Sequence, residues 1–287
     1  MRPNAFSGLN PFLVEGIVAR TVADAGLALT SLAGYDSRDP FSLDERIDFR
    51  TTVDRPIAKW KIAFSADFGT FPVDGRIAET VARAVRAFEE AGAHVEEVDV
   101  DLRHDQREPS DLWCRLIMPG NVEAVEGFKA GGVDLLRDHR DDLPPQYLAW
   151  LEQGYRLSAL DVRRDQQMRS EVYDGVREVL DVYQLLVTPT LACLPVDNAD
   201  DGNTVGPSEI GGVEVDPLIG WRLTYPINFS GPPAASIPAG MIDGLPVGMQ
   251  IIGRRYADAD VLAASASFER VRPWHDTYRR GAEQPLG

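Results

Sequence analysis

Cysteine and histidine are scarce in this chain. Its 287 residues include only two cysteines, Cys114 and Cys193, which excludes a disulfide framework or a thiol-rich metal cage. The four histidines lie far apart and show no metal-ligand spacing, so we expect no metal. The chain also lacks a G-x-S-x-G nucleophile motif and any glycine-rich phosphate loop, so we expect no bound cofactor and find no self-contained catalytic motif.

Lysine is equally scarce, and acidic residues outnumber basic ones. Only Lys59, Lys61 and Lys129 are lysines, and 29 Lys+Arg against 45 Asp+Glu give a net charge of -16. This balance argues against a nucleic-acid partner, because phosphates must be neutralised by cations. Few lysines and many carboxylates are typical of salt-adapted proteins. A GC-rich genome also favours Arg over Lys, so both explanations stand.

No targeting or membrane segment is visible. The opening residues lack the apolar core of a signal peptide, and the apolar stretch 12–34 is interrupted by Glu15, Arg20 and Asp24. We therefore expect a soluble, cytoplasmic protein that has no membrane partner.

Hydrophobic periodicity predicts alternating helices and strands. Strands are expected at 60–66, 94–100, 185–190, 234–239 and 247–253, and residues 197–217 read as a loop. Helices are expected at 21–34, 74–92, 109–128, 145–183 and 258–268, with caps at Thr21, Asp74, Ser158 and Asp258. The strand–helix–strand order over 60–100 predicts a parallel pair with a crossover helix. The pattern favours one α/β domain over residues 1–287.

Three segments carry a family resemblance, and three shorter ones support it. The main segments are Ala19–Asp24, Thr224–Gly240 and Gly244–Arg254, and the supporting ones are Gly34–Pro40, Phe71–Asp74 and Leu186–Thr190. In this order and spacing the chain resembles the amidase signature family from about residue 10 to residue 275. The resemblance implies a mixed β-sheet flanked by helices, as in the C-terminal part of that fold.

The resemblance also implies a chemistry whose reacting groups are not in this chain. Family members hydrolyse carboxamides with a serine nucleophile, a second serine on a cis peptide bond, a lysine, and an oxyanion loop rich in glycine and serine. In the family these groups lie upstream of the segment that begins here at Ala19. No Gly-Gly-Ser-Ser stretch occurs, and no lysine precedes Lys59. We therefore expect no catalytic residue in this chain.

The resemblance points to a substrate-binding role for four residues. Trp221 stands where relatives that act on an amino-acid side chain carry an acidic residue, so it favours an uncharged or aryl amide. Thr188, Thr190 and Cys193 follow a predicted strand end and are expected to line the same cleft. Core packing is the alternative for Trp221. For Cys193 the alternative to a reactive thiol is a small buried or pocket-lining residue. For Asn228 and Ser230 we expect turn formation rather than substrate contact.

The sequence leaves three functions open. The leading one is the C-terminal portion of an amidase acting on a small carboxamide, working as a homo-oligomer or with a separate catalytic partner chain. The alternative is a non-catalytic remnant or scaffold that keeps the fold and binds a partner. The third is an independent hydrolase built on Cys193, for which no neighbouring base is evident.

Salt dependence separates the two explanations of the acidic composition. Carboxylate repulsion is screened over about 3 Å at 1 M salt against about 10 Å at 0.1 M. If acidity is an adaptation, the melting temperature should rise steadily from low salt to molar KCl in a thermal-unfolding series. A flat response would leave coding bias as the explanation.

Overall fold

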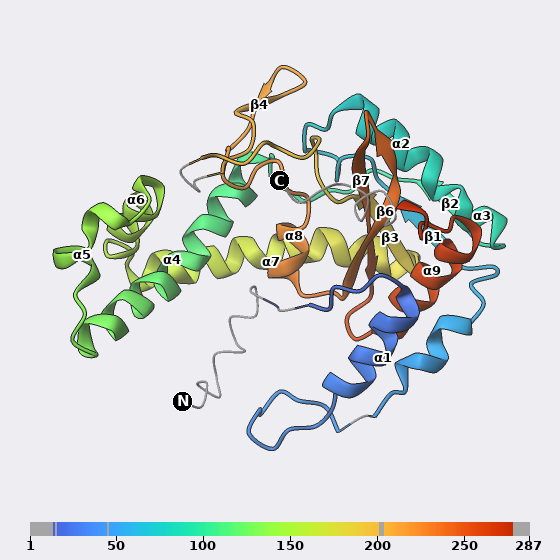
Figure 1. The fold of residues 1–287 in the computed structure, drawn as a ribbon, viewed down its shortest axis with the longest axis horizontal. Coiled ribbons are helices and arrows are strands. Elements are labelled where there is room, and N and C mark those ends of the chain that lie inside the picture. Colours follow the sequence, from blue (N-terminus) through green and yellow to red (C-terminus); the bar gives the residue numbers. More distant parts are fainter. Residues whose placement is uncertain (1–13, 15, 45, 201–203, 278–287) are drawn as a thin grey trace.

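A five-stranded mixed sheet forms the centre of the molecule. The computed structural model describes residues 14, 16–44, 46–200 and 204–277 (Figure 1). Along the sheet the strands run β2 (His94–Glu97), β1 (Lys61–Phe64), β3 (Leu185–Pro189), β7 (Leu245–Gly253) and β6 (Ala234–Ile242). The first three are parallel, whereas β7 is antiparallel to both of its neighbours. The predicted α/β class with a mixed sheet is confirmed.

Helices cover both faces of this sheet (Figure 1). One face packs against α2 (Gly75–Val85), α3 (Ala87–Glu90) and α9 (Asp258–Val271), with α1 (Val22–Leu32) and the 3-10 helix η2 (Phe49–Asp54) beyond them. The other face packs against α4 (Arg107–Ala130), α7 (Ala159–Val182) and α8 (Tyr225–Ser230). Shorter elements complete the described chain: α5 (Leu135–Asp138), η3 (Arg140–Asp142), α6 (Pro145–Gly154), β4 (Glu209–Ile210) and β5 (Val213–Glu214).

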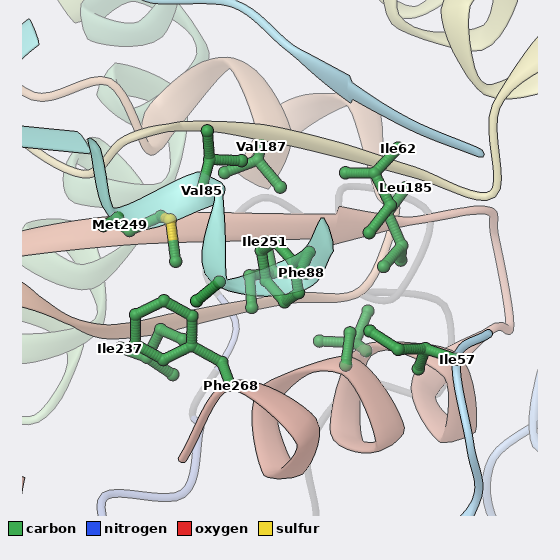
Figure 2. Close-up of a cluster of buried hydrophobic side chains, with 14 of the residues drawn as sticks. Ile57, Ile62, Val85, Phe88, Leu185, Val187, Ile237, Met249, Ile251 and Phe268 are labelled. Carbon is green, nitrogen blue, oxygen red and sulfur yellow. The ribbon is translucent and has the colours of Figure 1, made fainter. Parts of the chain in front are cut away.

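Alternation along the strands divides the apolar side chains between two cores. In β3 all five residues are buried; Leu185 and Val187 point into the core beneath α2 and α9, and Leu186 points into the core beneath α7. Figure 2 shows the first of these cores, in which the rings of Phe88 and Phe268 lie 5.6 Å apart. Strands buried on both faces read as continuous apolar runs, and β3 fits this pattern.

Three of the four predicted helix caps are confirmed. The Thr21 hydroxyl accepts from the Asp24 N–H at 3.0 Å, and the Asp74 carboxylate accepts from the Arg76 N–H at 2.9 Å. Ser158 forms a full capping box at the start of α7. The prediction for Asp258 is wrong, because Ala257 is the cap residue and Asp258 is the first residue of the helix. At that position the negative charge of Asp258 still interacts favourably with the positive N-terminal end of the helix dipole.

Two hairpins differ from the predicted boundaries. Residues 197–217, expected to be a loop, contain the β4–β5 hairpin, whose Gly211-Gly212 turn has φ values of +59° and +84°. Strands β6 and β7 extend beyond the predicted 234–239 and 247–253 until they meet at Asp243-Gly244, with φ values of +51° and +81°. Glycine pairs and Asp-Gly are favoured in two-residue hairpin turns with positive φ, so each pair allows the strands on either side to continue up to the turn.

A helical glycine in α7 offers a test of close packing. A Cβ at Gly175 would lie 2.2 Å from the carbonyl oxygen of Asp101. We expect Gly175→Ala to lower the free energy of unfolding, because overpacking costs roughly 1–3 kcal/mol and the better helix propensity of Ala returns only about 1 kcal/mol. Urea unfolding followed by circular dichroism measures the change.

The matched control is Gly120→Ala in α4, where an added Cβ meets nothing within 4 Å. This variant should be as stable as the parent or slightly more stable. If Gly175→Ala is stabilised to the same extent as Gly120→Ala, the close approach of α7 to residues 101–102 is not a constraint on the fold.

Candidate functional site

The segment that follows β3 pairs with the segment that leads into α8. The Leu223 N–H donates to the carbonyl of Thr190 at 3.1 Å, and the Ala192 N–H donates to the carbonyl of Trp221 at 2.9 Å. An isolated antiparallel bridge lies between these two bonds. The pairing gathers the four predicted substrate-binding residues near the C-terminal end of β3, the edge at which open α/β sheets bind ligands.

Thr188 stabilises the C-terminal end of β3 through a buried hydrogen bond. It is fully buried, and its Oγ1 accepts from Gln250 Nε2 at 3.1 Å. The same Nε2 donates to the carbonyl of Leu223 at 3.1 Å. Gln250 therefore ties β3 and β7 to the segment before α8, and removing either contact would leave a buried polar group unsatisfied.

Thr190 and Cys193 lie closer to the surface. Thr190 Oγ1 is 2.8 Å from Ser236 Oγ, and an added Cβ at Gly248 would lie 2.8 Å from that same Oγ1, so the strand needs glycine there. Cys193 is half-buried, and burial followed by the nearby Asp74 carboxylate raises the pKa of its thiol. A raised pKa keeps the thiol protonated and unreactive at neutral pH.

Trp221 is packed into the core beneath α7 and α8. Its side chain is 7% exposed, and its Nε1 donates to the carbonyl of Pro217 at 2.9 Å. Gly206 lies flat against the indole, since a Cβ there would be 2.1 Å from Nε1. The Arg222 guanidinium lies over the ring at 4.7 Å from its centroid. Trp221 is thus held rigidly by its neighbours.

An open cleft of about 460 Å³ lies beside this packed tryptophan. We call it the α8 cleft. Its lining combines apolar, aromatic and polar side chains from α4, from α8, from the segment before α8 and from residue 14. It consists of Val14, Trp113, Ile219, Arg222, Thr224, Tyr225 and Asn228. Predominantly apolar walls with a few polar groups are typical of small-molecule sites.

The aromatic wall of the α8 cleft is anchored by Tyr225. Its hydroxyl lies 2.9 Å from Ser110 Oγ, and its ring lies 6.0 Å from the rings of both Phe71 and Trp113. Burial is the main cause of the raised pKa of Tyr225, to which the carboxylates of Asp216 and Asp111 add. The phenol therefore stays neutral and serves as wall and hydrogen-bonding group rather than as a base.

The predicted residues stand next to the lining of this cleft rather than in it. None of Thr188, Thr190, Cys193 and Trp221 belongs to the described lining set, so direct contact of these four with a substrate remains a prediction. Asn228, for which a turn was expected, instead lies within α8 and lines the cleft. Positions 224, 225 and 228 belong to the motif that carried the resemblance, and helical spacing places 224 and 228 on one face.

The three lysines lie away from the α8 cleft. Lys59 and Lys61 lie at the start of β1, and because β1 runs parallel to β3 this is the edge opposite the cleft. Lys129 is in the last turn of α4 and lies 3.5 Å from the Asp134 carboxylate. None of them belongs to the described lining, so none is placed to deprotonate a nucleophile there.

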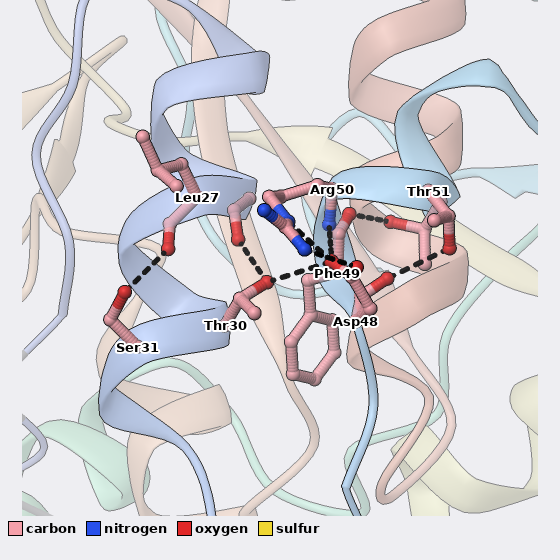
Figure 3. Close-up of polar contacts among 9 residues, drawn as sticks. Leu27, Thr30, Ser31, Asp48, Phe49, Arg50 and Thr51 are labelled. Atoms are coloured by element: carbon pink, nitrogen blue, oxygen red, sulfur yellow. Dashed lines mark hydrogen bonds and ion pairs between the residues drawn. The ribbon is translucent and has the colours of Figure 1, made fainter.

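A second hollow, of about 620 Å³, lies between α1 and η2 and is polar. Figure 3 shows the polar contacts of Thr30, Asp48 and Arg50 in this region. Its side chains bond to one another: Arg50 Nη2 is 2.6 Å from Asp48 Oδ2, and Thr30 Oγ1 donates to the carbonyl of Gly26 at 2.8 Å. Thr30 Oγ1 also lies 3.5 Å from Asp48 Oδ1, which joins α1 to the start of η2. Because these polar groups bond to one another, we take the α8 cleft as the candidate site.

The described residues also bear on metal and membrane binding. Within residues 14–277, apart from the few undescribed positions, no group of three or more His, Cys, Asp or Glu side chains is arranged to hold a metal ion. Over the same part of the chain, no helix combines the length and apolarity that a membrane crossing requires.

Known proteins resemble this chain along most of its length. In a solved structure, a bacterial aryl acylamidase of the amidase signature enzymes is 47% identical and superposes with a TM-score of 0.96, over 100% of this chain and 58% of that one. Acylamidase from Rhodococcus erythropolis is 32% identical over 268 residues, which are 91% of this chain and 53% of that protein. A glutamyl-tRNA(Gln) amidotransferase subunit from Streptococcus pyogenes serotype M12 is 29% identical over 91% of this chain and 54% of its own length.

The chain thus spans about half the length of the curated relatives that it matches. The family model for Amidase matches residues 10–262, which include β3, α8 and every described residue of the α8 cleft. The chain therefore belongs to the amidase family, among the amidase signature enzymes.

Proposed function

We propose that this chain takes part in the hydrolysis of aryl or small carboxamides, and that it supplies a wall of the substrate cleft and part of the sheet. The observation that carries this proposal is the α8 cleft, whose aromatic and polar lining is formed on the family motif at 224–230. The 47% identity to an aryl acylamidase along the full chain supports an aryl amide over the side-chain amide of an amino acid.

Each wall of the cleft has a role in binding such a substrate. Trp113, Ile219 and Tyr225 offer apolar and aromatic surface for the ring. Thr224 and Asn228 offer a hydroxyl and a carboxamide for hydrogen bonds to an amide group. Because these side chains are held rigidly, they position the carbonyl carbon of the substrate for attack. Such positioning lowers the activation barrier even though none of these side chains reacts itself.

The nucleophile comes, in this proposal, from the remaining part of the amidase fold. An apolar surface is available for that part to cover: Val18, Leu27 and Leu32 are 101%, 52% and 76% exposed. Helix α1 packs Val22 and Gly26 inward yet carries leucines on its outer side as well. Exposed apolar side chains that gather on one surface mark a contact surface, so we expect the outer side of α1 to meet that part.

Reconstitution tests this proposal. The purified chain alone should hydrolyse no anilide above background, and mixing it with the part of the aryl acylamidase that it does not match should produce turnover. Leu27→Glu with Leu32→Glu should lower that turnover more than about tenfold, because two charges would be buried at the contact. Release of the arylamine, measured spectrophotometrically, provides the rate.

Val182→Glu is the matched control, because Val182 is 59% exposed at the end of α7, away from α1. It should leave the reconstituted rate unchanged. Turnover by the chain alone, with stoichiometric labelling of one of its serines by a phosphonate probe, would contradict the proposal. Assembly without turnover would favour the non-catalytic scaffold.

The thiols provide a separate test of where the nucleophile lies. Burial raises the pKa of Cys114 to about 12 and raises that of Cys193 above its ordinary value of 9.0. Both thiols are therefore protonated at pH 7, and iodoacetamide should label neither at an appreciable rate. As pH rises, Cys193 should react before Cys114, and mass spectrometry identifies the labelled residue.

Labelling in urea is the control, because unfolding removes the desolvation and both thiols should then react at an ordinary rate. Rapid stoichiometric labelling of Cys193 in the folded protein at pH 7 would favour an independent thiol hydrolase instead.

A further inference from the structure

Arg222 is the cation among the described lining residues of the α8 cleft, and its position is fixed by aromatic stacking. Its guanidinium lies over the Trp221 ring at 4.7 Å, and its backbone N–H donates to the carbonyl of Ile219 at 2.9 Å. Stacking occupies one face of the guanidinium and leaves the N–H donors along its edge available. Because Trp221 is itself packed against Gly206, the guanidinium rests on a rigid support.

Arg222 is one of the exposed arginines that form no ion pair in the described part of the chain, and among these it is the one that lines the α8 cleft. Other exposed arginines do meet a carboxylate, as Arg103 meets Glu178 at 2.5 Å and Arg140 meets Glu152 at 2.8 Å. Within the described part of the chain, Arg222 is exposed and forms no ion pair. Its charge is therefore free to act on a ligand in the cleft.

We propose that Arg222 forms an anion subsite of the α8 cleft, which selects aryl amides that carry a carboxylate on the end of the molecule remote from the amide. The ring lies against Trp113 and Tyr225, and the carboxylate accepts two N–H bonds from the guanidinium edge. Trp221 acts as a positioning residue that holds the guanidinium in place. This inference rests on the proposed amidase function and names its substrate class.

Ligand binding to the intact chain tests the subsite without requiring turnover. 4-Carbamoylbenzoate and terephthalamide have nearly the same shape and differ in one carboxylate against one carboxamide. The wild-type chain should bind 4-carbamoylbenzoate about three- to tenfold more tightly by isothermal titration calorimetry. The preference should weaken as salt is raised, because exposed charges are screened.

Variants of Arg222 localise the preference. Arg222→Gln should abolish or invert it, because the net charge of -16 otherwise repels an anion. Arg222→Lys should retain part of it, since a point charge remains but the planar edge is lost. The matched control is Arg255→Gln, because Arg255 stacks in the same way over Tyr256 at 4.9 Å but lies outside the cleft lining.

Three results would overturn the subsite: equal or weaker binding of the carboxylate by the wild-type chain, a preference that survives in Arg222→Gln, or no saturable binding of 4-carbamoylbenzoate up to about 10 mM. These three results concern ligand binding, whereas the proposed function is tested by turnover after reconstitution. The failure of one can therefore be distinguished from the failure of the other. A chain that assembles and hydrolyses anilides without preferring the anion would contradict the subsite alone.

Discussion

Burial of β3 on both faces is the constraint on which the sheet and the cleft depend. This strand lies between parallel β1 and antiparallel β7, and all five of its residues are buried. Because side chains alternate, the strand joins the core under α2 and α9 to the core under α7 and α8. The chain leaves β3 at one fixed point and immediately pairs with residues 221–223. The position of α8, and with it the cleft, follows from that pairing.

The polar interior is organised around the same strand end. Gln250 satisfies both Thr188 and the carbonyl of Leu223, so one buried amide links β7, β3 and the approach to α8. Buried polar groups that are fully bonded specify one arrangement, because any slip would leave a donor or acceptor unsatisfied. The Trp221 side chain also fixes this region, because it packs against both Gly206 and Arg222. The cleft is therefore built on a rigid frame, as positioning of a substrate requires.

Charge is distributed unevenly over this frame. Many of the exposed arginines form ion pairs with nearby carboxylates, which are worth little to stability in water. The guanidinium of Arg222 is instead stacked on an indole at the edge of a cleft. Exposed leucines lie on α1. The proposed substrate cleft and the proposed contact surface thus differ in physical property, because one carries a stacked cation and the other carries exposed apolar side chains.

Local chemistry made much of the fold predictable from the sequence. The caps at Thr21, Asp74 and Ser158 and the apolar run of β3 each depend on neighbours within a few residues. The family motif at 224–230 also contains three lining residues of the α8 cleft, Thr224, Tyr225 and Asn228. The strand ends at Asp243-Gly244 differ from the prediction although their signal is local, because an Asp-Gly pair forms a two-residue turn and the strands continue up to it.

The sequence by itself determined the α/β class, the order of the elements and the family, because these follow from periodicity, caps and motifs read along the chain. Only the tertiary structure decided which residues face the cleft. Trp113 and Arg222 are distant in sequence and meet there because α4 packs against α8. Thr188 and Trp221 turn inward because Gln250 and Gly206 provide their contacts there. Side-chain direction at a strand end depends on partners far along the chain, and no local pattern contains that information.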